Sequence, residues 1–438
     1  MGVFYIFAFI YPDYFSMDKL LIKSATLIFP GADEDGQQVD MLIVAGKIAA
    51  LGPIGSLKTD DDVIVIQAEG SVLAPGFFDL NANFGEPGLE SKEDIVSGAA
   101  AAAAGGFTAV AVHPNTHPPI HSQTEVSLIV NRSNNLLVDV YPIGAISQNR
   151  EGKDLAELYD MKLAGAIAFS DGNRSIQQSG LMSRALLYSK GFGGLVFAFS
   201  EDASVAGKAK MNEGRMSTYL GMKGNPNLAE ELMVARDLYL AAYNEAPIHF
   251  STISTAGSVD LIRSAKAKGL QVTCDVAAHH LLLTDEALID FDSNYKVKPP
   301  LRSEVDRLAL VEAVRDGSVD AIVSQHTPHE IEFKEVEFET AAFGITGLQT
   351  VLPILLMAGL SNREIVQALA IAPRKIVGLP IPVCQLDENA NLVLYNPDEQ
   401  WTFDRESNRS KAENNPFFKK ELRGKVQLVI NNGQVYYG

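Results

Sequence analysis

The middle of the chain alternates short apolar runs with helix-like segments, and this alternation limits the possible folds more than any other feature. The helix-like EDIVSGAAAAAAGG precedes the apolar FTAVAVHP, and DLAELYDMKLAG precedes AIAFSD. The pattern continues through LQVTCDVA, DRLALVEAVRDG and VDAIVSQ. Strands that are apolar throughout, joined by helices and short loops, are typical of a parallel sheet covered by helices.

About eight such units favour an α/β fold with a closed (β/α)8 barrel over an open, doubly wound sheet. No Gly-x-Gly-x-x-Gly motif opens a helix after the first strand, which counts against a dinucleotide-binding sheet. In a barrel of this kind the chemistry lies at the C-terminal ends of the strands. Those ends are therefore where we look for functional residues.

Both ends of the chain carry a different pattern, in which short apolar runs alternate with turns. LLIKSATLIF and VDMLIVAGKIAALGP lie near the start, and NLVLYNP and KVQLVINNGQVYYG near the end. We therefore expect one small composite β-sandwich domain from residues 17–72 and 385–438, and a barrel over residues 73–384. Residues 1–16 are too short to span a bilayer and lack the features of a signal peptide. We expect them to be an extension outside the fold, with a surface-docked aromatic segment as the alternative.

Charge and cysteine content limit the partners and the compartment. The chain has 36 Lys and Arg against 54 Asp and Glu, a formal net charge of −18. Such a surface repels nucleic acids and anionic membranes, so we expect neither as a partner. The two cysteines, Cys274 and Cys384, suggest neither a disulfide framework nor a thiolate zinc site. Both features fit a cytoplasmic protein.

One strand end carries an unusual pair of amides. In FDLNANFGEPG, residues 78–88, Asn81 and Asn83 are two apart on an expected strand, so both point to the same side. A hydrolytic barrel enzyme usually presents imidazoles in this way, and they hold a cation that lowers the pKa of bound water to about 7. Amide oxygens bind hard cations such as calcium but are poor zinc ligands.

The histidines offer no clear replacement for that pair. His113, His117 and His121 have helical spacing, but three prolines among them forbid a regular helix, so a loop is the better interpretation than a metal site. His249 lies on the opposite side of its strand from Thr252. A structural or solvated role is the default for the remaining four, which are His279, His280, His326 and His329.

The segment FDLNANFGEPGLESKEDIVSGAAAAAAGGFTAVAVHPNT resembles the opening of the barrel in dihydroorotases of the amidohydrolase superfamily, the branch found in multifunctional pyrimidine complexes. Further similar segments are MNEGRMSTYLGMKGNP, KPPLRSEVDR, DGSVDAIVSQHTPH and WTFDRESNRSKAENNPF, so the resemblance extends from Met17 to the C-terminus. It implies the barrel and composite β-domain expected above. It also implies the reversible, zinc-dependent ring closure of N-carbamoyl-aspartate to dihydroorotate.

The resemblance places the family's metal ligands on residues of another kind. The first two histidine ligands fall on Asn81 and Asn83, and two later histidines fall on Phe199 and Thr252. The aspartate that would be both a metal ligand and the general acid/base falls on Gln325. The bridging aspartate is retained as Asp171.

Positions implied to bind substrate are also altered. The arginine that would bind the substrate carboxylate falls on Gly85, the second aspartate of the bridging segment on Gly172, and an asparagine on Lys298. Asn115 and His329 are retained, and the resemblance implies substrate-side roles for them.

Phenylalanine cannot bind a metal, and glutamine cannot accept a proton from bound water. We therefore predict no remaining catalytic residue, no metal site and no cofactor. The expected function is that of a non-catalytic dihydroorotase homologue, a homo-oligomer that resembles scaffold subunits assembling with aspartate carbamoyltransferase.

Two alternatives stay open. The first is an active dihydroorotase, or a related cyclic amidohydrolase, with a rearranged zinc site. The second is a sensor that binds dihydroorotate or carbamoyl aspartate through Asn115 and His329 without reacting. The missing guanidinium at Gly85 weakens the second, because a bidentate contact with the ligand carboxylate is gone.

Overall fold

The computed structural model describes residues 15–16, 19–58 and 62–438. In this part of the chain, eight parallel strands form one sheet in the order β16-β15-β14-β11-β10-β9-β8-β7. The strands are β7 (Phe77–Ala82), β8 (Phe107–Val112), β9 (Asp139–Gly144), β10 (Ala168–Phe169), β11 (Val196–Phe199), β14 (Ile248–Ser251), β15 (Val272–Ala277) and β16 (Ala321–Val323). The predicted (β/α)8 barrel is confirmed.

Contacts between the first and last strands close the barrel. Ala82 forms a parallel bridge with His326, and the Asn83 N–H donates to the His326 carbonyl at 2.8 Å. The Ser324 N–H donates to Oδ1 of Asp79 at 2.8 Å. Apolar side chains fill the barrel interior, among them Phe78, Leu80, Ala109, Ile143, Phe197 and Val323. The interior is therefore a packed core, as barrels of this kind require.

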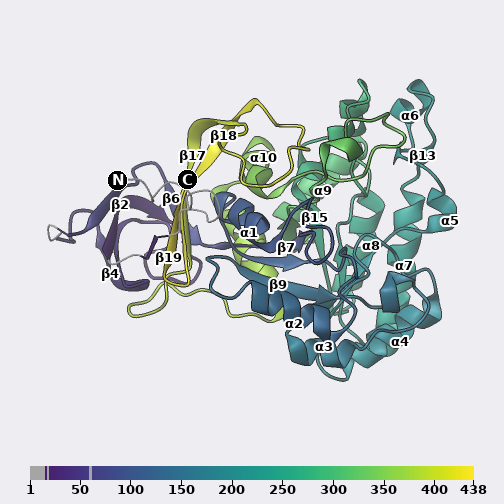
Figure 1. Cartoon of the computed structure of the whole chain (residues 1–438), viewed down its shortest axis with the longest axis horizontal. Coiled ribbons are helices and arrows are strands. Elements are labelled where there is room, and N and C mark those ends of the chain that lie inside the picture. The colour runs from purple at the N-terminus through teal and green to yellow at the C-terminus, as the bar shows by residue number, and fades with distance from the viewer. Residues whose placement is uncertain (1–14, 17–18, 59–61) are drawn as a thin grey trace, which may run out of the picture.

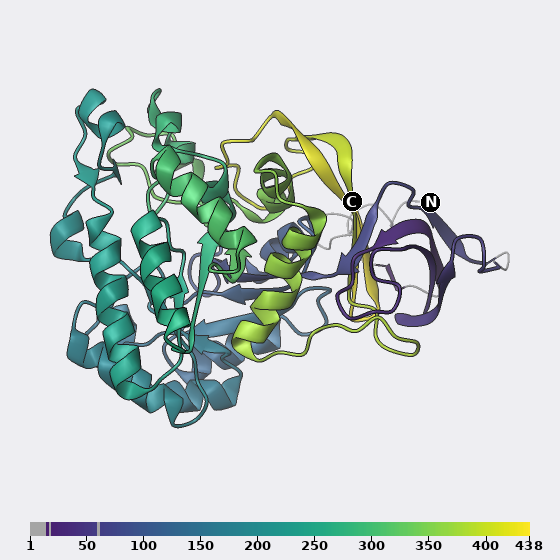
Figure 2. The same cartoon turned by 180° about the vertical axis from the view of Figure 1, so that it is seen from behind.

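Helices surround the barrel and cover its outer face (Figure 1 and Figure 2). The principal ones are α1 (Ile95–Ala104), α2 (Gln123–Arg132), α3 (Leu158–Ala164), α4 (Ser179–Lys190), α7 (Leu228–Asn244), α8 (Ala256–Ala267) and α9 (Glu304–Arg315). Shorter helices are α5 (Ala203–Ala206), α6 (Arg215–Tyr219), α10 (Val351–Met357), α11 (Asn362–Val366) and α12 (Ala372–Val377). In α1, Asp94 and Ser97 form a capping box, and the alanines that follow have high helix propensity and pack in the core.

The two ends of the chain build one β-domain beside the barrel (Figure 1). Within the described residues its sheet has nine strands, in the order β1-β19-β18-β17-β6-β2-β3-β4, with β5 paired to β2. They are β1 (Phe15–Ser16), β2 (Lys19–Leu27), β3 (Gln38–Val44), β4 (Lys47–Pro53), β5 (Ile64–Gln67), β6 (Val72–Pro75), β17 (Leu392–Phe403), β18 (Lys420–Asn431) and β19 (Gln434–Tyr437). Its core is separate from the barrel core and includes Leu20, Ile22, Met41, Leu394 and Ile430.

The structure differs from the expected domain limits in two places. Residues 15 and 16, which we expected outside the fold, pair with β19, where Phe15 lies opposite Val435. The preceding residues of the expected extension lie outside the described part of the chain. Strand β6 continues to Pro75, three residues past the expected limit, because it pairs with both β17 and β2.

Two further properties bear on the sequence predictions. No helix in residues 15–16, 19–58 and 62–438 is long and apolar enough to cross a membrane. Cys274 and Cys384 are both unpaired and buried. Burial raises the pKa of the Cys384 thiol to about 11, which keeps it protonated near neutral pH.

Candidate functional site

The C-terminal ends of the barrel strands surround a small cavity of about 40 Å³. Five of the predicted site residues line it: Asn81, Asn83, Asn115, Phe199 and Gln325. At 10–15 Å³ per water, such a cavity holds about three water molecules. Pockets for organic ligands are roughly ten times larger. The cavity therefore has no room for a ring-shaped substrate in this conformation.

Asn81 and Thr252, two expected ligand positions, bind each other. Nδ2 of Asn81 donates to Oγ1 of Thr252 at 3.0 Å and lies 3.4 Å from Oγ of Ser251. The Thr252 N–H donates to Oδ1 of Asp275 at 2.7 Å. The two positions are thus joined by neutral hydrogen bonds, and Thr252 is absent from the cavity lining.

Asn83 is hydrogen-bonded to the segment that follows β16. Its Nδ2 donates to the His326 carbonyl at 2.9 Å and to Oγ1 of Thr327 at 3.0 Å. Its Oδ1 accepts a hydrogen bond from Nδ2 of Asn115. The amide of Asn83 is therefore used fully within the protein.

Asp171, the one retained carboxylate ligand position, is turned away from the cavity. Its oxygens accept hydrogen bonds from the N–H of Ser147 at 2.9 Å and from the Ser147 hydroxyl. Burial raises the pKa of this carboxyl above its ordinary value, although the Ser147 bonds oppose the rise. Its backbone carbonyl accepts from Nε and Nη2 of Arg150 at 2.9 and 2.8 Å. Asp171 thus serves to fix the loop after β10.

Two glycines leave no space for the side chains that the resemblance implies. A Cβ added at Gly85 would collide with the carbonyl oxygens of Leu89 and Glu93. At Gly172, where φ is +64°, a Cβ would collide with Oδ1 of Asn115. The backbone has closed around Gly85, and the Asn115 side chain occupies the space beside Gly172, so neither an arginine at 85 nor an aspartate at 172 would fit without rearrangement.

Phe199 and Gln325 complete the cavity wall with a ring that cannot bind a metal and an amide that cannot accept a proton. Nζ of Lys298 lies 5.4 Å from the Phe199 ring centre and 2.8 Å from Oε1 of Glu201. Nε2 of Gln325 donates to the Lys298 carbonyl at 2.7 Å. Lys298 therefore contacts both substituted positions, which the sequence alone did not indicate.

The histidines do not converge on the cavity. His249 is buried, with its ring nitrogens 2.8 Å from Oδ2 of Asp275 and 2.8 Å from Oγ1 of Thr273. His326 lies 3.4 Å from Glu93 and accepts from the Gly347 N–H at 3.2 Å. His113 is the one histidine in the lining of this described cavity, and burial lowers its pKa to about 4.

His329, an expected substrate-side residue, lies outside the lining of the cavity. Its Nε2 is 2.9 Å from the carbonyl oxygen of Phe343, and its N–H donates to Oδ1 of Asn414 at 3.0 Å. It therefore connects the segment after β16 to the C-terminal part of the chain. Of the two retained substrate-side residues, the structure places only Asn115 at the cavity.

A buried pair of lysines holds the segment that covers the cavity. Nζ of Lys296 donates to the carbonyls of Phe338, Glu339 and Ala341, and Nζ of Lys334 donates to those of Ser293, Ala342 and Gly344 at 2.6, 2.9 and 3.0 Å. Phe343 and Gly344 of this segment line the cavity. Sequence reasoning missed both lysines, because nothing in NYKVKPP or EFKEVEFE distinguishes a buried ammonium from an exposed one.

The site does not suit zinc. A zinc site needs imidazole, thiolate or carboxylate donors, usually four in a tetrahedron. In the described part of the chain, no group of three or more His, Cys, Asp or Glu side chains is placed to hold a metal ion. The expected ligand positions carry two asparagines, a phenylalanine, a threonine and a glutamine, and the remaining Asp171 binds Ser147.

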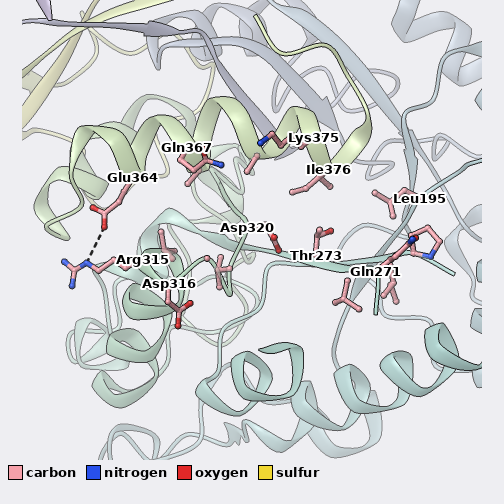
Figure 3. Close-up of a pocket in the computed structure, with 18 of the residues that line it drawn as sticks. Leu195, Gln271, Thr273, Arg315, Asp316, Asp320, Glu364, Gln367, Lys375 and Ile376 are labelled. Atoms are coloured by element: carbon pink, nitrogen blue, oxygen red, sulfur yellow. Dashed lines mark ion pairs between the residues drawn. The ribbon is translucent and has the colours of Figure 1, made fainter. Parts of the chain in front are cut away.

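A larger cavity of about 800 Å³ lies at the opposite end of the barrel (Figure 3). Its lining includes Gln271 and Thr273 at the start of β15 and Gln367 and Lys375 from the last helical segment. None of the predicted site residues lines it. Since barrel enzymes place their chemistry at the C-terminal ends of the strands, we do not assign the function to this cavity.

Acid is expected to destabilise the protein through its buried histidines. Burial lowers the pKa of His113 and His280 to about 4 and that of His279 well below its ordinary value of 6.5. Between pH 6.5 and 4 these rings stay neutral when folded but take up protons when unfolded, so stability falls as the pH falls. Burial also raises the pKa of Asp79 and Asp237 to about 6, which opposes this trend between pH 6 and 4.

At 1.36 kcal/mol per pKa unit, His113, His280, Asp79 and Asp237 each contribute on the order of 3 kcal/mol, so the four roughly cancel. His279, whose pKa is lowered well below 6.5, then leaves a net loss of stability in acid that Asp171, with its raised pKa, only partly opposes. Urea unfolding at pH 7 and pH 4.5 measures it. Equal or greater stability at pH 4.5 would contradict the prediction.

Comparison with known proteins relates the whole chain to one family. The family model described as "Dihydro-orotase-like" matches residues 70–258. The protein "Dihydroorotase" of Geotalea daltonii is 41% identical over 424 residues, covering 96% of this chain and 99% of its own length. The "Dihydroorotase" of Syntrophus aciditrophicus is 42% identical over 425 residues, covering 96% and 99%.

Among solved structures, the L-hydantoinase (dihydropyrimidinase) from Arthrobacter aurescens superposes with a TM-score of 0.81 over 96% of each chain. Its sequence is 23% identical to this one. At that identity the likeness shows the fold alone, and it covers both the barrel and the accessory β-domain.

Proposed function

Because the chain belongs to the dihydroorotase family, we propose that it is a dihydroorotase-like protein of pyrimidine biosynthesis that no longer carries out metal-dependent ring hydrolysis. The observation that supports this proposal is what the side chains at the expected metal-ligand positions of the barrel mouth bind. Asn81 binds Thr252, Asn83 binds Asn115, and the carboxylate of Asp171 binds Ser147. No set of zinc donors and no proton acceptor at position 325 is left to activate water.

The lack of space for a side chain at Gly85 and Gly172 supports the same proposal independently of the metal. Binding a substrate carboxylate needs a cation in the cavity, and the one lysine in its described lining, Lys298, pairs with Glu201 at 2.8 Å. The site has therefore lost groups for both substrate binding and catalysis, while the barrel around it is intact.

We propose further that the chain acts through protein–protein contact, as a scaffold subunit that assembles with aspartate carbamoyltransferase. The fold and the family resemblance extend across the whole barrel and β-domain, although the mouth is altered. Retention of the fold with loss of the site is what an assembly role requires. A scaffold role of this kind needs neither a bound metal nor the cavity at the barrel mouth.

A second candidate is an active dihydroorotase with a rearranged zinc site. The specific observation in its favour is the comparison itself, since relatives named dihydroorotase are about 40% identical over nearly the full chain. This candidate needs new ligands around Asp171. It predicts tightly bound zinc and turnover, which the first proposal does not.

Zinc content separates the two candidates. The full chain, purified from zinc-replete cells, is expected to contain near-zero zinc by mass spectrometry, while the Geotalea daltonii relative, purified in parallel, serves as the control. One or two tightly held equivalents per chain would contradict the first proposal. Co-elution with aspartate carbamoyltransferase on a sizing column tests the scaffold role, and separate elution of the two proteins at micromolar concentration would count against that role.

A further inference from the structure

The cavity of about 800 Å³ at the N-terminal end of the barrel, called the basal groove below, has the size of a site for a small organic molecule. Figure 3 shows Gln271 and Thr273 on the strand side of the groove and Gln367, Lys375 and Ile376 on the helix side. The cavity at the barrel mouth measures about 40 Å³. A small organic molecule therefore fits the basal groove and not the mouth.

Apolar side chains form much of the wall of the basal groove. They come from strand starts, from the end of α9 and from the last helical segment, and they include Leu195, Ile248, Leu270, Val272, Val314 and Ile376. Leu195 and Ile376 also pack against the apolar cluster inside the barrel. The hydrophobic effect therefore favours a ligand with an apolar body in this groove.

All but one of the charged side chains in the described lining are paired within the protein. Their ion pairs are Arg315–Glu364 at 3.9 Å, Asp316–Arg263 at 2.8 Å, Asp320–Lys266 at 2.6 Å and Arg363–Asp35 at 2.7 Å. The exposed side chain of Lys375 has no ion pair and no hydrogen bond within the described residues. The groove therefore presents one unbalanced positive charge.

Two amides add neutral hydrogen-bonding groups on opposite walls. The side chains of Gln271 and Gln367 are exposed and make no hydrogen bond within the described part of the chain. Each offers both a donor and an acceptor. The Thr273 hydroxyl, in contrast, already lies 2.8 Å from Nδ1 of His249 inside the barrel. The amides and the ammonium of Lys375 are thus the polar groups left for a ligand.

The helix side of the groove contains a π-helical turn over Gln367–Ile371. The Ala372 N–H donates to the Gln367 carbonyl, five residues earlier. Pro373, which follows directly, has no N–H to continue an α-helical pattern. Turns of this kind are rare and lie frequently at functional sites. Here the turn places Gln367 and Ala368 in the groove wall.

We propose that the basal groove binds an organic monoanion with an apolar body, whose carboxylate pairs with Lys375 and whose apolar part lies against Ile376 and Val314. Gln271 and Gln367 bind neutral oxygens or N–H groups of the same molecule. This binding goes beyond the function proposed above and involves no chemical step. A binding role agrees with the position of the groove, because barrel enzymes carry out chemistry at the opposite end.

The charge pattern selects a single negative charge. A cationic ligand would face Lys375 without a partner, and like charges brought together weaken binding. A dianion such as a phosphate ester would bring a second charge for which the described lining has no free cation, since Arg315 and Arg363 are already paired. Discrimination of this kind depends as much on the unpaired charge of the wrong ligand as on contacts to the right one.

Calorimetric titration of the full chain with decanoate tests the proposal. We expect one equivalent to bind per chain with a dissociation constant below about 100 μM. Decan-1-ol has the same apolar chain without the charge, so it reports the apolar contacts alone. In Lys375→Gln the dissociation constant for decanoate is expected to rise about 5-fold, the effect of losing one exposed ion pair, whereas that for decan-1-ol stays unchanged.

A second variant tests the location. In Gln367→Trp the indole fills part of the groove, so both decanoate and decan-1-ol are expected to bind at least about 10-fold more weakly, the effect of excluding two methylene groups. The control is Lys47→Gln, because Lys47 is an exposed lysine of β4 in the β-domain and is absent from the lining of the groove. Its binding of decanoate is expected to equal that of the natural chain.

Four results would each overturn the proposal. They are the absence of saturable decanoate binding up to about 1 mM, unchanged decanoate binding in Lys375→Gln, unchanged binding in Gln367→Trp, and a loss in Lys47→Gln equal to that in Lys375→Gln. Circular dichroism of each variant establishes that it has folded. Because the titration measures binding at the groove, its outcome does not depend on whether the chain hydrolyses dihydroorotate.

Discussion

Turnover of dihydroorotate by this chain is expected to be at least about 10⁴-fold slower than by the Geotalea daltonii relative, because general acid–base catalysis alone contributes about 10²–10⁴. The expected acid/base position holds Gln325, whose amide donates to the Lys298 carbonyl at 2.7 Å. Activation of water by a metal adds several more kcal/mol in enzymes that use it, and the donor set here does not suit zinc. On the proposal that the site is lost, the general acid–base contribution and the metal contribution are both absent.

Initial rates in both directions, with and without added zinc, measure this difference. The matched control is Asp171→Asn. A trace of a contaminating host enzyme would give the same low rate in both preparations, whereas a rate that belongs to a rearranged site around Asp171 would fall in the variant. A natural-chain rate within about 100-fold of the relative, lost in Asp171→Asn, would establish the active alternative.

Replacement of Arg302 by leucine is expected to lower the free energy of unfolding by about 3–5 kcal/mol, the usual cost of removing one partner from a buried charge pair. Its guanidinium is 3% exposed. Nε donates to Oγ of Ser254 at 3.0 Å, and Nη1 donates to Oδ1 of Asn212 at 3.1 Å and to the Asn225 carbonyl at 2.8 Å. Leucine fills part of the volume but leaves these acceptors, and the Glu230 carboxylate 3.7 Å away, without their donor.

Urea unfolding of the variant at pH 7 measures the loss. Arg405→Leu is the matched control, because it makes the same chemical change where the side chain is 79% exposed and pairs with Glu413 alone. An exposed pair of that kind contributes about 0–1 kcal/mol. A loss below about 1 kcal/mol in Arg302→Leu would show that the segment around Asn212 and Asn225 is held by other contacts.

Much of the fold could be predicted because it depends on local pattern. The apolar run Phe107–Val112 and the alanine-rich helix before it have the periodicities of a buried strand and a packed helix, and both form as expected. The terminal strands were recognisable for the same reason. The pairing of Phe15 with Val435 was not, because it joins residues more than 400 positions apart and no local pattern encodes the partner.

At the site, the chemical groups that are present follow from the sequence alone. Asn81, Asn83, Phe199, Thr252 and Gln325 are amides, a ring and a hydroxyl, and no arrangement can make them imidazoles or carboxylates. What these groups bind, and how much space they leave, depends on the folded structure. It turned Asp171 toward Ser147, closed the backbone at Gly85, and placed the ammonium groups of Lys296 and Lys334 among backbone carbonyls.

The physical reason for this division is that side-chain chemistry belongs to each residue, whereas burial and hydrogen-bond partners depend on segments distant in the sequence. The same reason applies to the outer face of α7. The spacing of Leu228, Leu232, Ala235, Tyr239 and Ala242 can be read from the sequence, but a helix of a barrel can turn these side chains inward or outward. Only the folded structure shows that they face away from the core.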